Sequence, residues 1–326
     1  MIVCGGEALI DMVPVEMPGG KTGFLPYPGG SPYNTALAVG RLGAPVQFLG
    51  RLSRDFFGDL LIQRLIQNQV GTDLLVRSCE HSTLAFVRLE AGREPQYIFY
   101  TEGTADRSLS PVDIPAQLPA ATRCIMFGSI AMTMEPVASA IESLIFREYA
   151  RTAAQGKPGL VISVDPNIRP FMIQDRAAYV SRFEGWLRAS TILKISAEDV
   201  AYIYPGLTLQ ASMEHVLRLG PRLVLVTQGS AGALAVLQRD TGALVRVQTP
   251  GIPVRVADTI GAGDTFHGAF LAWLELKGNL SPHQVASLTE GELSEALGFA
   301  NKAASLVCTR HGANPPSLTE VEAFKE

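Results

Sequence analysis

An alternation of short apolar runs with longer amphipathic stretches limits the fold of this 326-residue chain more than any other feature. Runs such as 223–227 are apolar at nearly every position, which is typical of parallel strands buried on both faces. Strands that alternate with helices predict an α/β protein whose mostly parallel sheet is covered on both faces. The predicted strands are 2–9, 45–50, 124–128, 160–164, 192–195 and 223–227, and the predicted helices are 32–42, 57–67, 137–153, 177–187 and 209–219.

Two stretches, 12–28 and 84–100, break this alternation. Both read as extended segments with internal turns, at 18–20 in the first and at 91–93 in the second. We expect them to form a small sheet that is inserted in the main domain rather than appended to it. A separate hairpin is predicted at 233–247, where an Asp-Thr-Gly sequence supplies the turn.

Charge and hydropathy exclude several classes of protein. The chain has 27 basic and 31 acidic residues, a formal net charge of −4, and no basic stripe of the kind that nucleic acid binds. No apolar run approaches the length of a membrane span, and the first residues lack the basic start of a signal peptide. Four widely separated cysteines without a Cys-x-x-Cys pair favour free thiols, three of them buried, and a cytoplasmic location (Cys4, Cys79, Cys124, Cys308).

The strongest motif is Asp258-Thr-Ile-Gly-Ala-Gly-Asp264, which leads directly into a predicted helix at 265–276. The small residues Gly261, Ala262 and Gly263 let backbone N–H groups turn toward one point, and the helix N-terminus adds its positive end, so an anion site is expected. Asp264 would then accept a proton from an attacking hydroxyl while the amides stabilise a transferred phosphoryl group.

The alternative is a glycine-rich turn whose aspartate only caps the helix. We favour the anion site because Asp258 lies six residues earlier and the small pair Gly268-Ala269 lies on the next turn.

A second motif, Gly29-Gly30-Ser-Pro-Tyr-Asn34, precedes the helix predicted from Pro32, with Ser31 as its N-cap. The glycines let a ligand approach the backbone, and Asn34 offers a donor and an acceptor to hydroxyl groups. The alternative is plain capping, in which Asn34 bonds within the first turn. Asp11 can accept two hydroxyl hydrogens of a polyol, although a lone aspartate after a strand is more often a turn residue.

These two motifs, in this order and far apart, resemble the signatures of the ribokinase-like sugar kinases of the phosphofructokinase-B type. Gly6-Glu7-Ala-Leu-Ile-Asp11 is most similar to the bacterial fructokinase branch. The resemblance covers nearly the whole chain and implies one kinase domain over 1–326. It implies a three-layer αβα sandwich with a β-sheet lid formed by the insertions at about 12–28 and 84–100.

The resemblance also implies an activity, the transfer of the γ-phosphoryl group of ATP to the 6-hydroxyl of D-fructose. Alternatives with the same fold are kinases of 2-keto-3-deoxygluconate, ribose or a nucleoside, and Arg169 or Arg107 would supply the cation that an acid sugar needs. A non-catalytic sugar-binding regulatory protein is the alternative from another class. Exposed apolar residues on the lid imply a homodimer through it (Phe24, Leu25, Phe86, Phe99).

Residue roles follow from the same resemblance. Asp264 is the expected base, with the backbone of Gly261, Ala262 and Gly263 as the anion hole. The expected sugar-binding residues are Asp11, Gly29, Gly30, Asn34 and Arg169. The expected nucleotide-binding residues are Thr227, Gly229, Gly232 and Asn301.

Two metal sites are implied as well. Glu198 or Asp199 would order the water shell of Mg²⁺, and the choice stays open because the chain has Ser196-Ala-Glu-Asp where the family has Asn-x-x-Glu. The carbonyl groups of Asp258 and Ile260 would hold a K⁺-type ion behind the anion hole. Thr101 stands where the fructokinase branch commonly has arginine, so one lid contact to the substrate is missing.

Overall fold

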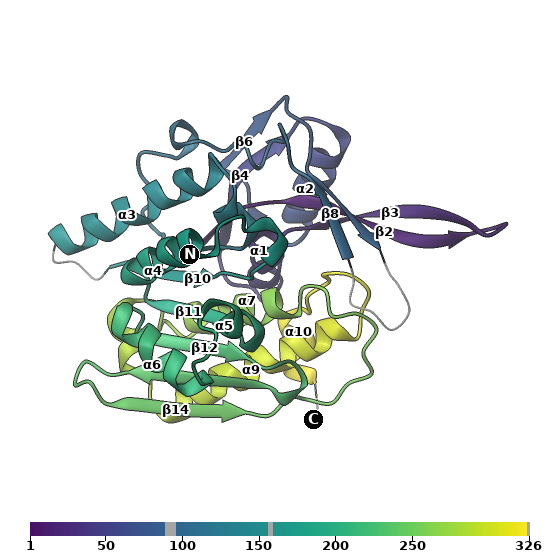
Figure 1. The fold of residues 1–326 in the computed structure, drawn as a ribbon. Coiled ribbons are helices and arrows are strands. Elements are labelled where there is room, and N and C mark those ends of the chain that lie inside the picture. The colour runs from purple at the N-terminus through teal and green to yellow at the C-terminus, as the bar shows by residue number, and fades with distance from the viewer. Residues whose placement is uncertain (89–95, 156–158, 325–326) are drawn as a thin grey trace.

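The computed structural model describes residues 1–88, 96–155 and 159–324 (Figure 1). Its main sheet has ten strands in the order β14-β13-β12-β11-β10-β9-β1-β4-β5, with β6 beside β4. The strands from β12 to β5 are parallel, and β13 and β14 return antiparallel. Their bounds are β1 Ile2–Gly5, β4 Val46–Ser53, β5 Val70–Gly71, β6 Leu75–Ser78, β9 Cys124–Gly128, β10 Val161–Asp165, β11 Ile192–Ser196, β12 Leu223–Thr227, β13 Ala233–Gln238 and β14 Leu244–Thr249.

Helices cover both faces of this sheet, because alternate side chains of each strand enter two separate cores. On β9, Cys124 and Met126 belong to one core and Ile125 and Phe127 to the other. The first core is covered mainly by α1 Ser31–Arg41, α2 Phe56–Gln67, α7 Ala262–Leu276, α8 Pro282–Ser287, α9 Glu290–Cys308 and α10 Leu318–Ala323. The second is covered by α3 Val137–Gln155, α4 Arg176–Ala189, α5 Ala197–Ile203 and α6 Leu209–Leu219. The predicted three-layer αβα sandwich is confirmed.

Four short 3₁₀ helices connect these elements: η1 Pro111–Asp113, η2 Ser129–Thr133, η3 Pro170–Met172 and η4 Gly229–Ala231. Across the described ranges, no helix has both the length and the hydropathy that crossing a bilayer requires.

A second, four-stranded sheet has the order β3-β2-β7-β8. Its strands are β2 Leu9–Met17, β3 Lys21–Gly29, β7 Leu84–Arg88 and β8 Gln96–Tyr100. The β2–β3 hairpin projects away from the body of the molecule (Figure 1). The small sheet predicted from 12–28 and 84–100 is therefore present, and the turn predicted at 91–93 lies outside the described residues.

Of the four apolar residues predicted to be exposed on this sheet, two are exposed and two are not. Phe24 and Leu25 are exposed. Phe86 and Phe99 are half-buried, because Phe86 packs edge-on against Phe24 and Tyr100, and Phe99 stacks on Phe171.

Three local predictions need correction. The strand predicted at 2–9 is two strands, because the chain turns at Gly6, which has a φ of 151°, and enters the small sheet at Leu9. Ser31 is not an N-cap, since α1 begins with it and Gly30 occupies the cap position. Of the three cysteines predicted to be buried, Cys4 and Cys124 are, whereas Cys308 is half-buried.

The strand order places a crevice at the carboxyl ends of the central strands of the main sheet. From β1 the chain moves one way to β4, and then passes to β9 and on to β12 on the other side of β1. Helices that leave neighbouring strands in opposite directions open a gap at the carboxyl ends of those strands, which is where α/β proteins bind ligands.

Candidate active site

A cavity of about 1280 Å³ opens at this crevice. Glu7 and Ser129, which follow β1 and β9, line one part of it, and the segment 257–264 lines another. The small sheet contributes Asp11, Val13, Val87 and 97–99. Both sequence motifs therefore face one cavity, and the predicted lid forms part of its wall.

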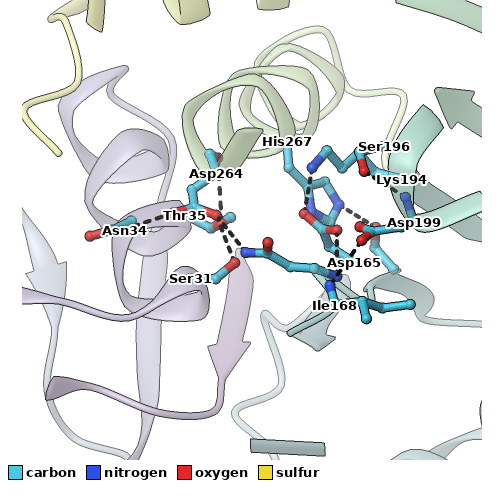
Figure 2. Close-up of polar contacts among 12 residues, drawn as sticks. Ser31, Asn34, Thr35, Asp165, Ile168, Lys194, Ser196, Asp199, Asp264 and His267 are labelled. Carbon is cyan, nitrogen blue, oxygen red and sulfur yellow. Dashed lines mark hydrogen bonds and ion pairs between the residues drawn. The ribbon is translucent and has the colours of Figure 1, made fainter. Parts of the chain in front are cut away.

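Asp264 lies in the first turn of α7 with its carboxylate held from two sides (Figure 2). The Ser31 hydroxyl donates to Oδ1 at 2.7 Å, and the Asn34 amide donates to Oδ2 at 2.9 Å. Burial raises the pKa of Asp264, and these two hydrogen bonds oppose that rise. The arrangement gives an oriented carboxylate in a cavity, as a general base requires.

Asn34 does not bond only within its own turn, as plain capping would require. Its Nδ2 reaches Asp264, while its Oδ1 is buried without a hydrogen-bond partner among the described residues. A buried acceptor without a partner costs free energy of folding. A ligand hydroxyl that donates to this oxygen would remove that cost.

The glycine loop before α7 is held in place by a left-handed glycine and by the Asp258 carboxylate. Gly261 caps the helix with a φ of 76°, and a Cβ there would lie 2.8 Å from that of Ala313. The Asp258 carboxylate accepts hydrogen bonds from the amides of Ile260 at 3.0 Å and Gly312 at 2.9 Å, which fixes the loop. Helix α7 begins at Ala262, three residues before the predicted Thr265, and residues 261–264 line the cavity.

Asp11 lies inside strand β2, opposite Tyr27, so its interpretation as a turn residue is wrong. Burial raises the pKa of Asp11 to about 7, while the nearby Arg169 guanidinium lowers it. A Cβ on Gly29 would collide with the Asp11 carboxylate, which explains the glycine there. Gly30 and Arg169 also line the cavity, so Arg169 is not an ordinary surface arginine.

The four residues expected near the nucleotide gather elsewhere, around 249–251. Thr227 ends β12, and η4 links it through Gly229 to Gly232, where a Cβ would meet the backbone of Thr249 and Gly251. Asn301 donates from Nδ2 to Thr249 Oγ1 at 2.7 Å and to the Pro250 carbonyl at 3.2 Å. These residues do not line the cavity around Asp264, but they flank the segment that leads from β14 to its glycine loop.

Comparison with known proteins decides the class of this site. Residues 1–320 match the model of the pfkB family of carbohydrate kinases. The chain belongs to this family. It is 38% identical to a fructokinase of Rhizobium leguminosarum bv. trifolii over 293 residues, 90% of this chain and 85% of the relative.

Two solved structures are similar over nearly all of this carbohydrate kinase. The fructokinase of Xylella fastidiosa with bound ATP has a TM-score of 0.86 at 29% identity, with 99% of this chain and 97% of that one covered. A double mutant of the Vibrio cholerae fructokinase, bound to fructose, ADP and a potassium ion, has a TM-score of 0.83 at 25% identity, with 100% and 98% covered.

The two carboxylates expected near Mg²⁺ differ in position in this kinase. Glu198 is exposed, whereas Asp199 turns inward and accepts a hydrogen bond from the Ile168 amide at 3.2 Å. Burial raises the pKa of Asp199 to about 6. Among the described residues, no group of three or more His, Cys, Asp or Glu side chains is arranged to hold a metal ion.

The sequence interpretation missed Lys194 and Asp165. Lys194 lies in β11 and lines the cavity, and its Nζ is 2.7 Å from Oδ2 of Asp165 at the end of β10. The available signal was a lysine inside the apolar run 192–195, since a strand buried on both faces accepts a charged residue only with a partner.

Proposed function

We propose that this kinase transfers the γ-phosphoryl group of ATP to the 6-hydroxyl of D-fructose. The observation that carries the proposal is the Asp264 carboxylate, held by Ser31 and Asn34 beside the glycine loop and in the same cavity as Asp11. Its fructokinase relatives, one of which has fructose bound, support this substrate. The intact base and loop argue against a non-catalytic sugar-binding protein.

In the proposed mechanism Asp11 and the free Oδ1 of Asn34 accept hydroxyl hydrogens of the sugar, and Arg169 donates to it. The sugar is then oriented with its primary hydroxyl at Asp264. Asp264 accepts the hydroxyl proton as the oxygen bonds to the γ-phosphorus, the bond to the β–γ bridging oxygen breaks, and ADP leaves. The amides of 261–263 stabilise the charge on the phosphoryl oxygens during transfer.

The remaining roles complete the site. Bound Mg²⁺ would neutralise phosphate charge, and Asp199, rather than the exposed Glu198, would hold its water shell. The carbonyl groups of Asp258 and Ile260 would bind a K⁺-type ion behind the glycine loop. The Asp258 carboxylate holds this loop in place through its hydrogen bonds. The nucleotide would lie along the residues around 249–251 (Thr227, Gly229, Gly232, Asn301).

Charge favours a neutral ketose over a keto-acid sugar. Within the described residues Asp11, Asp258 and Asp264 line the cavity against the cations Arg169 and Lys194, and Glu7 also lines it, although burial raises the pKa of Glu7 to about 8. Arg169 already lies close enough to Asp11 to lower the pKa of that carboxyl. The carboxylate of a keto-acid sugar would therefore have to share Arg169 with Asp11.

The small sheet would act as a lid on this one kinase domain, excluding water so that the phosphoryl group reaches the sugar. Its surface suggests a second copy of this chain as partner, because Phe24 and Leu25 on one edge strand, β3, and Ile98 and Tyr100 on the other, β8, are 42% to 62% exposed. Sedimentation of the wild type and of a Phe24→Ser/Leu25→Ser variant would test this: a dimer that the variant loses supports it, and a wild-type monomer contradicts it.

A cytoplasmic location fits ATP as the donor and the four free cysteines.

A coupled ADP-release assay over a panel of sugars, with and without K⁺, tests the proposed reaction. We expect fructose to give the highest kcat/KM and K⁺ to increase it. Turnover of 2-keto-3-deoxygluconate, ribose or a nucleoside with fructose inert would contradict the proposal.

A further inference from the structure

Lys194 is the one charged side chain of β11. It is the third residue of β11, and its side chain is only 5% exposed. Its Nζ forms an ion pair of 2.7 Å with Asp165, which is fully buried (Figure 2). Buried ion pairs seldom stabilise a fold more than apolar residues of the same size, so the presence of this one calls for another explanation.

The Lys194 ammonium group points to the glycine loop. A Cβ built on Gly263 would lie 3.0 Å from Nζ, so the amine is directly beside the backbone that begins α7. Lys194 lines the same cavity as Gly263 and Asp264. Glycine at 263 thus leaves the room that the amine occupies.

The ion pair with Asp165 leaves some of the N–H donors of Lys194 without a partner in the described part of the chain. An ammonium group has three N–H donors, and within the described residues Nζ donates a hydrogen bond to Asp165 alone. Burial opposes the charged form, yet Asp165, Asp264 and Asp199 together raise the pKa of Lys194 above its ordinary value. The residue therefore carries a permanent positive charge with two donors left for a ligand.

His267, one turn after Asp264, does not neutralise or replace this cation. Its Nε2 is 2.7 Å from the Ser163 hydroxyl, and burial lowers its pKa well below the usual range, so the imidazole is uncharged. Lys194 is thus the cation adjacent to the loop on this side of the cavity, with Arg169 on the sugar side near Asp11.

We propose that Lys194 is a catalytic residue whose ammonium group donates hydrogen bonds to a non-bridging oxygen of the phosphoryl group during its transfer. Asp165 acts as a positioning residue that holds Nζ beside Gly263. Lys194 keeps its proton throughout, so the bonds made and broken are those of the transfer to the sugar described above. The inference rests on the proposed function and adds one group to its anion site.

The variants must separate catalysis from folding, because Lys194→Met alone leaves Asp165 buried without its partner. The main variant is therefore Lys194→Met/Asp165→Asn, which removes both charges together. Lys194→Gln/Asp165→Asn is a second version with a polar pair, and Asp165→Asn alone keeps the ammonium group. We expect both double variants to unfold thermally as cooperatively as the wild type.

Steady-state kinetics give the first readout. In both double variants kcat should fall at least about 10²-fold, as for loss of one oxyanion-stabilising donor, with the KM for sugar changed less than about threefold. Asp165→Asn should lose less than about tenfold, because the cation remains. A double variant that folds and keeps kcat within about threefold of the wild type would overturn the proposal.

Calorimetry with a mimic of the transferred group gives the second readout. The wild type should bind ADP with aluminium fluoride and sugar more tightly than ADP with sugar alone, and the double variants should lose that difference while binding ADP normally. An equal loss of affinity for both ligand sets would indicate a structural role and overturn the proposal. If the wild type phosphorylates a sugar other than fructose, the substrate assignment fails while the same comparison with that sugar still tests Lys194.

Discussion

The Ser31 hydroxyl donates a 2.7 Å hydrogen bond to Oδ1 of Asp264, although 233 residues separate the two in the chain. This contact joins the first turns of α1 and α7. The two helices can approach closely because residue 268 is a glycine. A Cβ at this position would lie 2.8 Å from both the Ala38 side chain and the Thr35 carbonyl. Small residues one turn into α7 thus allow two distant motifs to form one site.

Replacing Ser31 tests whether this contact tunes the base. In Ser31→Ala the Asp264 carboxylate loses a hydrogen bond that lowers its pKa, so the acidic limb of the kcat profile should move to higher pH. At neutral pH kcat should fall about tenfold, which is ~1.4 kcal/mol in the barrier. Ser287→Ala, an exposed serine on α8 that bonds its own helix, is the matched control. An unshifted profile in Ser31→Ala would show that the contact is not part of the mechanism.

Asp11 predicts a pH dependence for sugar binding. Because burial raises its pKa to about 7, lowering the pH through neutrality protonates it and removes an acceptor for sugar hydroxyls. The KM for fructose should therefore rise between about pH 8 and about pH 6, while the KM for ATP stays flat. In Asp11→Asn the KM for fructose should be high throughout and nearly independent of pH. A wild-type slope that persists in this variant would assign the titration to another group.

Two glycines with nearly equal φ angles allow the effect of backbone strain on stability to be separated from an effect on catalysis. Gly261 and Gly278 have φ values of 76° and 74°, but a Cβ meets Ala313 at the first and nothing at the second. Alanine at either position should cost about 1 kcal/mol of unfolding free energy, and more at Gly261. Only Gly261→Ala should also lower kcat, by at least about tenfold. Equal activity in the two variants would argue against an anion site at this loop.

The burial of Asp199 predicts which carboxylate orders the metal's water. Asp199→Asn should raise the Mg²⁺ concentration for half-maximal activity at least about fivefold, and Glu198→Gln should raise it less because Glu198 is exposed. Titrating Mg²⁺ at saturating ATP and fructose measures both effects. The reverse order would assign the role to Glu198.

Much of the main fold was predictable because buried parallel strands have an unambiguous pattern. The runs at 124–128 and 223–227 are strands at the predicted bounds, since they are apolar on both faces. The break after Gly5 was not predictable, because residues 2–9 are apolar enough to continue as one strand and only tertiary contacts turn the chain at Gly6. Helix α7 began early for a similar reason, as capping by Gly261 is a property of the folded loop.

The candidate site was predictable where a motif holds adjacent residues and not where the fold joins distant ones. Asp264 and its glycine loop form a contiguous signature, and the cavity contains them. The use of Asn34 as a donor to Asp264 depends on how α1 meets α7, which no local pattern encodes. Lys194 was missed because its meaning depends on Asp165 and Gly263, which lie on other elements.

The rate of Asp264→Asn with saturating ATP and fructose tests the central claim most directly. Asparagine keeps the size of the side chain but cannot accept the hydroxyl proton, so kcat should fall by about 10²–10⁴-fold while the melting temperature stays close to that of the wild type. A folded Asp264→Asn enzyme with kcat within about threefold of the wild type would contradict the assignment of Asp264 as the base.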